Sequence, residues 1–338
     1  MSSFPLSDPR ERALATLHGL AVGDALGMPS QLMSRAEIES RWGRIAGFEA
    51  GPGDHPIAAD LPAGSITDDT EQALLLAELL VESGGTLDPE VWARRLVSWE
   101  DEMRARGSLD LLGPSTKSAI AAVLAGTPAT EAGRFGTTNG AAMRIAAVGI
   151  AVRPDNLDVL VDRVTAACLV SHNTGVAIAG ASAVAAAISA GVAGATLEEA
   201  IDLAIEAAFR GATRGHWIAG ADIATRIEFV VGDGAEYAVD DLVELIGTSL
   251  ASQESVPMAF ALAARSDGDA WEAALGAANS GGDTDTIGAI AAAICGAVGG
   301  ADAVPASAVA AVTAANPTLL EASRLGTLVD GLLELRGS

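Results

Sequence analysis

Apolar residues recur at intervals of three and four along almost the whole chain, and this periodicity is what most restricts the fold. Such spacing places apolar side chains on one face of an α-helix, whereas a half-buried strand alternates with a period of two. Alternation is nearly absent, and residues 226–231 are the single weak strand candidate. We therefore predict an all-α fold. Its clearest helices are expected at 71–81, 91–103, 119–125, 157–169, 197–209 and 319–335.

The breaks between the predicted helices are short. Residues 51–65, 126–138, 231–235 and 278–282 are rich in Gly, Pro, Asp and Thr, a composition typical of turns and loops. None is long enough or polar enough to be a linker, although 338 residues are sufficient for two domains. We predict a single compact domain over residues 1–338 that contains a dozen or more helices.

Charge and cysteine usage limit the class of protein. The chain has 44 acidic and 20 basic residues and no run of positive charge, so we expect no nucleic-acid partner. The acidity is explained mainly by solubility, with a share left for carboxylates at a cation site. Cys168 and Cys295 lie in apolar segments and have no partner at metal-ligand spacing. No signal peptide is visible, so we expect a cytoplasmic protein, as a monomer or weak dimer.

Two apolar stretches, residues 177–195 and 287–298, could be mistaken for membrane spans. They are rich in Ala and Gly rather than in Leu and Phe, so lipid would favour them little. The first has the length of a span, and the second is too short. Because small residues let helix backbones approach closely, both stretches are predicted to be central core helices, and no membrane partner is expected.

Two acidic clusters resemble each other: residues 64–71 (GSITDDTE) and 279–286 (NSGGDTDT). Helix capping explains the first by itself, because Thr67 or Asp68 can bond the free N–H groups of a helix. The second cluster has two aspartates alternating with threonines, where one aspartate would suffice for a cap. Carboxylates packed beside a core raise the electrostatic energy unless a cation neutralises them. Oxygen donors of this kind favour Mg²⁺ or Mn²⁺ over zinc.

Other motifs are less specific. Residues 23–27 (GDALG) lack the third glycine of a dinucleotide-binding loop, and no G-x-S-x-G sequence is present. His172 is one of four histidines, and packing or capping is the simpler explanation for it. Asn139 and Gly140 are typical of a turn. Arg144, one helical turn further on in an apolar segment, is expected to need an anionic partner.

Five motifs occur in the order seen in the ADP-ribosylglycohydrolases, and the chain resembles that family from about Arg12 to about Gly300. They are residues 23–27, 67–70 (TDDT), 139–144 (NGAAMR), 254–257 (ESVP) and 281–286 (GGDTDT). The two Thr/Asp motifs together are a specific signature, whereas the other three are weaker singly. The resemblance implies an all-α fold with two Mg²⁺ (or Mn²⁺) ions in a central cleft.

The resemblance also implies roles for individual residues. By motif position, the metal ligands are Thr67, Asp68, Asp69, Asp283, Asp285 and Thr286, with Asp68, Asp69 and Asp285 catalytic. The implied substrate contacts are Asn139, Arg144, His172, Gly281 and Gly282. The family cleaves the bond between ADP-ribose and an acceptor, so the expected substrate is an ADP-ribosylated protein or small molecule. Metal-bound ribose hydroxyls and nearby carboxylates suit a metal-activated water and an oxocarbenium-like transition state.

The chain departs from the family pattern on the acceptor side. Gln31 stands where many members have a glutamate, and residues 174–176 (TGV) stand where members often have His-Pro-Glu. Asp110 is the remaining candidate for an extra carboxylate near the leaving group. Two alternatives stay open: a metal-dependent N-glycosidase of a small nucleoside-like metabolite, and a binding or structural protein that kept the fold. The complete Asp/Thr clusters argue against the second.

Overall fold

The computed structural model describes residues 8–108 and 112–337. These residues form helices and loops without a strand; only two isolated β-bridges join Thr138 to Ala251 and Thr174 to His216. The prediction of an all-α fold is confirmed. The six predicted helices are α3 (Asp68–Glu82), α4 (Pro89–Ala105), α5 (Pro114–Leu124), α9 (Leu157–Cys168), α11 (Leu197–Gly211) and α18 (Ala322–Gly337).

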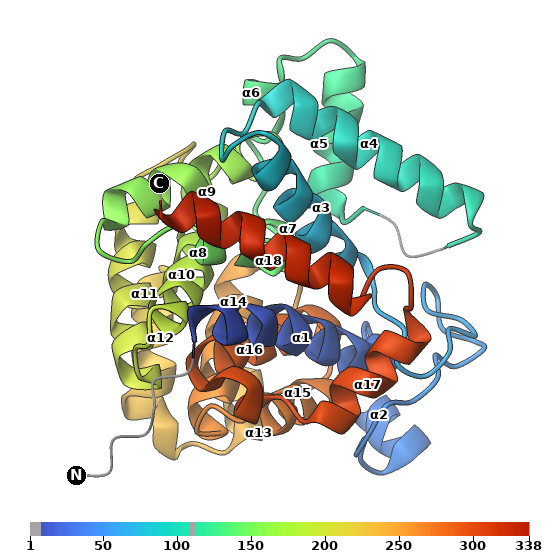
Figure 1. Ribbon diagram of the computed structural model, residues 1–338. Helices are drawn as coiled ribbons and strands as arrows, with labels where there is room; N and C mark the ends of the chain where they lie inside the picture. The colour runs from blue at the N-terminus through green and yellow to red at the C-terminus, as the bar shows by residue number, and fades with distance from the viewer. Residues whose placement is uncertain (1–7, 109–111, 338) are drawn as a thin grey trace.

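The remaining elements complete the helical array in Figure 1. The longer helices are α1 (Pro9–Gly27), α2 (Arg35–Trp42), α10 (Gly175–Val192), α12 (Ile223–Val231), α13 (Val239–Ile246), α14 (Ser252–Arg265), α15 (Ala270–Ala278), α16 (Thr284–Gly299) and α17 (Ala306–Ala315). The shorter elements are η1 (Met28–Ser30), α6 (Ala129–Ala132), α7 (Gly140–Met143), α8 (Ala146–Ala151), η2 (Asp233–Glu236) and η3 (Gly300–Ala303).

The strand suggested for residues 226–231 is wrong, because this segment belongs to α12. The Asp222 side chain caps the helix by accepting from the N–H of Thr225 at 2.7 Å. Ile223, Ile227 and Val230 are then buried on one face at helical spacing. Two apolar residues of the segment that suggested a strand, Ile227 and Val230, therefore lie on the core-facing side of a helix.

Helices α1 and α16 lie side by side at the centre of the protein, and both α17 and α18 contact α1 (Figure 1). The backbones of α1 and α16 touch through glycines. A Cβ added at Gly23 would lie 2.1 Å from the carbonyl oxygen of Gly288, and Gly19 and Gly27 are equally crowded by α16. Only a hydrogen side chain permits this approach. The contact brings the end of α1 against the start of α16, where the second acidic cluster lies.

The two apolar stretches are core helices. Residues 175–192 and 284–303 are long and apolar enough to cross a membrane, yet 94% and 72% of them are buried inside the protein. The second was predicted to be too short for a span, but with η3 it extends over 20 residues. Buried helices of soluble proteins pass the same test of length and composition, so these two are weak support for a membrane span.

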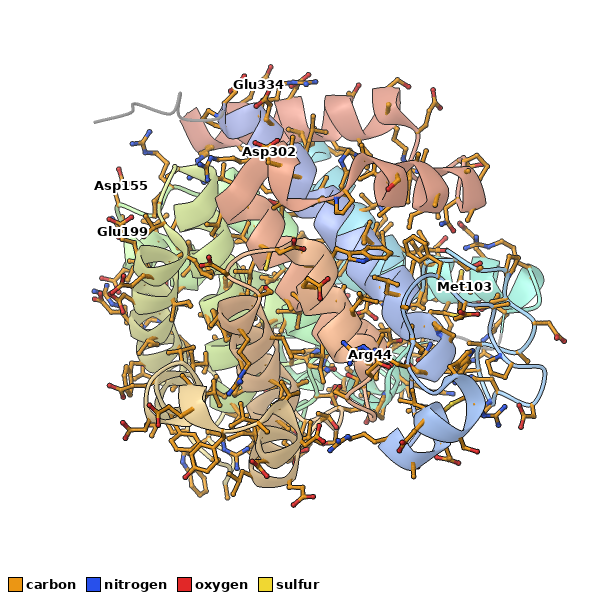
Figure 2. All side chains as sticks on the ribbon, turned by 90° about the horizontal axis from the view of Figure 1, so that it is seen from below. Arg44, Met103, Asp155, Glu199, Asp302 and Glu334 are labelled. Atoms are coloured by element: carbon orange, nitrogen blue, oxygen red, sulfur yellow. The ribbon has the colours of Figure 1, made fainter. Side chains whose placement is uncertain are left out.

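Acidic side chains lie mostly on the outside, as Asp155, Glu199, Asp302 and Glu334 do in Figure 2. The described residues include only four buried carboxylates. These are Asp24, Asp69, Asp283 and Asp285. All four belong to α1 or to the beginnings of α3 and α16. General acidity therefore accounts for the surface, and this one region requires a separate explanation.

Candidate active site

Helix α1 positions both acidic clusters. The buried carboxylate of Asp24 accepts hydrogen bonds from the backbone N–H and hydroxyl of Thr67, at 3.0 and 2.7 Å, and from Thr70. This anchors the start of α3. One turn further along α1, the carbonyl of Gly27 accepts from the hydroxyl of Thr284 at 2.8 Å, which anchors the start of α16. No role was predicted for Asp24, although a carboxylate within an apolar helix is a signal that the sequence contains.

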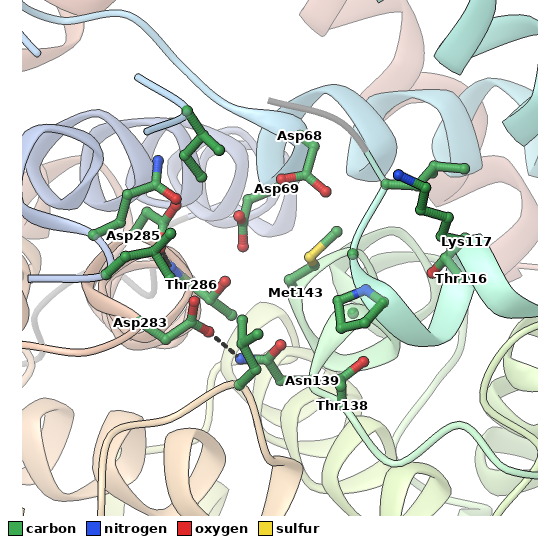
Figure 3. A pocket seen from close by; sticks show the side chains of 18 residues that line it. Asp68, Asp69, Thr116, Lys117, Thr138, Asn139, Met143, Asp283, Asp285 and Thr286 are labelled. Carbon is green, nitrogen blue, oxygen red and sulfur yellow. Dashed lines mark hydrogen bonds between the residues drawn. The ribbon is translucent and has the colours of Figure 1, made fainter. Parts of the chain in front are cut away.

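The two clusters open onto one cavity of about 270 Å³. Figure 3 shows Asp68 and Asp69 of α3 beside Asp283, Asp285 and Thr286 of the second cluster, all at the same space. The rest of the wall includes groups from α5, from the segment before α7 and from α7 itself: Thr116, Lys117, Thr138, Asn139 and Met143. The structure thus brings together segments more than 200 positions apart, as the motif analysis required.

Five of the six expected ligands line this cavity, and Thr67 does not. The Thr67 side chain is buried, and its hydroxyl lies 2.7 Å from an oxygen of Asp24 and 3.2 Å from an oxygen of Asp69. Thr67 is also the N-cap of α3, through a long 3.4 Å bond from the N–H of Asp69. Its position suits a residue that holds the carboxylates in place.

Helix capping does not explain Asp283. This residue is the N-cap of α16, but its side chain makes no capping hydrogen bond. Its carboxylate instead accepts from the side-chain amide of Asn139, which also donates to Ser255 Oγ at 2.9 Å. Asn139 was expected to contact substrate, and it lines the cavity while holding Asp283. Burial raises the pKa of Asp283 to about 6, partly offset by the Asn139 hydrogen bond.

The donor set fits a hard divalent cation. The cavity groups contributed by the two clusters are carboxylates and a hydroxyl, without nitrogen or sulfur. Within residues 8–108 and 112–337, however, no three His, Cys, Asp or Glu side chains are grouped closely enough to hold a metal ion. The two-ion centre implied by the resemblance is thus not apparent as a ready-made cluster, although its oxygen donors share one cavity.

Gly281 and Gly282 were expected to contact substrate, but neither is among the described residues that line the cavity. Both have positive φ, 75° and 78°. A Cβ at Gly282 would lie 2.3 Å from the carbonyl oxygen of Thr248, so protein backbone alone requires the glycine. The Gly282 carbonyl accepts from the N–H of Leu32 at 2.7 Å. The glycines therefore hold the loop that brings Leu32 and the nearly buried Gln31 to the cavity wall.

Arg144 was expected to line the pocket and to need an anionic partner; it is buried away from the described cavity lining, and the side chains that it contacts directly are neutral. Its side chain is 1% exposed and is not part of the described cavity lining. The guanidinium donates to Gln72 Oε1 at 2.8 Å and to Ser171 Oγ at 2.7 Å, and lies over the Trp92 ring. These partners are all neutral. Burial lowers the pKa of Arg144 to about 10, so it is charged at neutral pH.

His172, another expected substrate contact, is buried behind the cavity wall. Its ring nitrogens lie 2.8 Å from Ser171 Oγ and 3.0 Å from Thr138 Oγ1, and Thr138 is the residue that faces the cavity. Burial, with the charge of Arg144, lowers the pKa of His172 well below its ordinary value. Thr174, in the altered 174–176 segment, caps α10. Asp110 lies outside the described residues.

Comparisons with known proteins agree with this architecture. The family model for ADP-ribosylglycohydrolase matches residues 5–338. The Escherichia coli K12 protein called uncharacterized protein YegU is 36% identical over 299 residues, 87% of this chain and 89% of YegU. The ADP-ribosylarginine hydrolase Tri1 of Serratia proteamaculans is 31% identical over 119 residues, 35% of this chain and 30% of Tri1.

Among solved structures, an ADP-ribosylglycohydrolase-related protein complex matches with a TM-score of 0.70 and 26% identity, over 98% of this chain and 99% of that one. The match therefore extends over the helices that form the cavity as well as over the core. With a family model that spans nearly all residues, the conclusion is direct: the chain belongs to the ADP-ribosylglycohydrolase family.

Proposed function

We propose that this protein is a divalent-metal-dependent hydrolase that cleaves the glycosidic bond between ADP-ribose and an acceptor. The observation that carries the proposal is the convergence of buried carboxylates on one cavity from two Thr/Asp motifs. Family membership supports glycosidic hydrolysis, and the names of relatives such as Tri1 support ADP-ribosyl substrates. Mg²⁺ or Mn²⁺ is the cation expected for such oxygen donors.

Asp68, Asp69, Asp283, Asp285 and Thr286 would hold the cation. When bound, it would supply Lewis-acid activation of water and a binding point for ribose hydroxyls. The chain's own contribution is fixed negative charge beside C1′, which stabilises the positive charge that develops as the glycosidic bond breaks. Asn139 holds Asp283 through its amide, so that carboxylate is oriented before substrate arrives.

Lys117 supplies the charge that the diphosphate of ADP-ribose requires. It is the single lysine in the sequence, it lies at the edge of the cavity, and Arg144 is buried elsewhere. We expect Lys117→Met to raise KM for ADP-ribosylated substrates about fivefold, as for one exposed ionic contact. Lys117→Arg should restore most of the affinity. An equal rise in KM of Lys117→Met for uncharged nucleosides would contradict a contact between Lys117 and phosphate.

A second candidate function has specific support from the size of the cavity. At about 270 Å³, it lies just below the usual 300–1,000 Å³ of small-molecule sites. It encloses a ribosyl group more readily than a complete ADP-ribosyl group and acceptor. The alternative is therefore an N-glycosidase of a small ribosylated metabolite.

A side-by-side assay with Mn²⁺ separates the two functions. The substrates are ADP-ribosylarginine, ADP-ribosylserine, a small ADP-ribosylated compound and plain nucleosides. We expect metal-dependent release of ADP-ribose, slowest from arginine because Gln31 and residues 174–176 change the acceptor side. Faster cleavage of nucleosides would favour the N-glycosidase, and full activity after exhaustive chelation would refute the metal requirement.

A further inference from the structure

A series of hydrogen-bonded polar side chains runs behind the cavity and reaches it at both ends. Its members, in order of contact, are Asp68, Gln72, Arg144, Ser171, His172 and Thr138. The four inner members are each at most 1% exposed, whereas Asp68 and Thr138 line the cavity. The contacts between neighbours range from 2.7 to 3.0 Å, so every link has hydrogen-bond length.

We propose that Arg144 sets the direction of every hydrogen bond in this series of side chains. It thereby presents an oriented Asp68 carboxylate and a donating Thr138 hydroxyl to the ligand. A guanidinium has donors and no acceptor, so both bonds from Arg144 can point only outward. The two residues at the ends of the series then have fixed and different roles: Asp68 accepts a hydrogen bond from Gln72, and Thr138 accepts one from His172. The inference rests on the proposed function only in taking this cavity to be the active site.

The first arm orients Asp68. Arg144 Nη1 donates to Gln72 Oε1 at 2.8 Å, which fixes which end of the Gln72 amide is the oxygen. The amide nitrogen therefore faces Asp68 and donates to its Oδ2 at 2.7 Å. Without Arg144, the Gln72 amide could rotate and present its oxygen to the carboxylate. Partners of this kind orient metal ligands in known proteins.

The second arm fixes the tautomer of His172. Ser171 Oγ accepts from Arg144 Nη2, and its one other side-chain partner among the described residues is His172 Nδ1, at 2.8 Å. If Nδ1 carried the ring proton and donated to Oγ, the buried hydroxyl hydrogen of Ser171 would have no acceptor, so Ser171 donates to Nδ1. Nδ1 is then an acceptor, and the ring proton is on Nε2. Burial and the Arg144 charge lower the pKa of His172, which keeps the ring neutral at pH 7. The Nε2–H donates to Thr138 Oγ1 at 3.0 Å.

Thr138 therefore accepts on the protein side and has its hydroxyl hydrogen left for the cavity. An oxygen acceptor on the ligand, such as a ribose or phosphate oxygen, would complete this bond. A ligand group that can only donate, such as a guanidinium, could use the second lone pair of Oγ1 but would leave the hydroxyl hydrogen without an acceptor. Thr138 therefore favours a ligand that presents an oxygen acceptor to this wall.

The tautomer can be measured in the unmodified protein. Histidine labelled with ¹⁵N in the full chain gives ring-nitrogen shifts for only four residues, and the His172→Gln variant identifies the signal. We expect His172 to be neutral at pH 7 with its proton on Nε2. A proton on Nδ1, or an imidazolium at pH 6, would overturn the inference, whether or not the protein proves to be a hydrolase.

Variants test the two arms separately. Gln72→Met should weaken Mn²⁺ binding about 10- to 100-fold in calorimetry. Thr138→Val should leave Mn²⁺ affinity unchanged and weaken ADP-ribose binding about fivefold, the loss of one hydrogen bond. Arg144→Met should produce both losses. The inference would be overturned if the wild-type protein binds Mn²⁺ and ADP-ribose, Gln72→Met does not change the Mn²⁺ affinity and Thr138→Val does not change the ADP-ribose affinity. This outcome is decisive even if Arg144→Met fails to fold.

Arg12→Met is the matched control. Arg12 is also a buried arginine with uncharged partners, and it donates to the carbonyls of Gly191 and Ala297 at 3.0 and 3.2 Å. Its loss should lower the melting temperature and leave both affinities unchanged. If Arg144→Met behaves in the same way as Arg12→Met, Arg144 has only a structural role. A wild-type protein that binds neither probe would refute the proposed function and leave the tautomer result to decide the inference.

Discussion

Asp285→Asn is expected to lower kcat by about 10²- to 10³-fold or more, the loss typical of one preorganised electrostatic group in an active site. Asparagine keeps the size of the side chain, so the start of α16 should remain intact. The substitution removes one of the few buried charges and leaves one fewer anionic donor in the cavity. Steady-state hydrolysis with saturating Mn²⁺ measures the effect.

Thermal unfolding distinguishes a loss of cation binding in Asp285→Asn from a loss of its folded structure. Mn²⁺ at about 100 times its Kd should raise the melting temperature of the wild-type protein by roughly 3–5 °C. It should raise that of Asp285→Asn much less, while the melting temperature without metal stays close to wild type. Asp302→Asn, at an exposed carboxylate in η3, should match wild type in both assays. Wild-type activity in Asp285→Asn would refute the proposed site.

Helical periodicity was enough to predict most of the fold because burial follows it closely. In α3, for example, Ala73, Leu76, Ala77 and Leu80 are all buried on the face that the pattern predicted. It failed at residues 226–231, a short apolar segment of the kind that can form either a strand or a buried helix face. The cap supplied by Asp222 decides between them, and a single capping residue is a weak signal in a sequence.

The candidate site was predictable where several residues of one chemical type cluster. Asp68, Asp69, Asp283 and Asp285 share one cavity, as the two motifs indicated. Arg144 could not be placed in this way. An arginine in an apolar segment can bind a ligand or be buried against distant groups, and here its neutral partners are remote in the sequence. Gln72 precedes it by 72 positions, and Ser171 follows it by 27.

The glycines posed the same problem. Gly281 and Gly282 precede the second acidic cluster, so their freedom seemed to serve a ligand, whereas the structure uses it for contact with the protein's own backbone. The glycines of residues 23–27 were noted as part of a family motif, and no packing role was predicted for them. They are the surface on which α1 meets α16. Close backbone packing depends on three-dimensional proximity, which a sequence without aligned relatives does not reveal.

Gly23→Ala is the second substitution with a large expected effect. The added Cβ would lie 2.1 Å from the carbonyl oxygen and 2.3 Å from the carbonyl carbon of Gly288, in the backbone of α16. Backbone atoms cannot rotate aside as a side chain can, so α1 and α16 must separate. We expect a loss of about 3 kcal/mol or more in the free energy of unfolding, measured by denaturant titration. Gly47→Ala, where no atom lies within 4 Å, should change stability by less than about 1 kcal/mol.

The same substitution tests whether α1 aligns the two acidic clusters. Asp24 holds the start of α3 and Gly27 holds the start of α16, so a displacement of α1 should misalign the carboxylates of both. Leu332→Ala, in the core side of α18, provides a comparable loss of stability, about 2–5 kcal/mol, away from the clusters. We expect Gly23→Ala to weaken Mn²⁺ binding at temperatures where both variants are folded, and Leu332→Ala to leave it unchanged. Equal Mn²⁺ affinities in the two variants would show that α1 stabilises the fold without setting the geometry of the site.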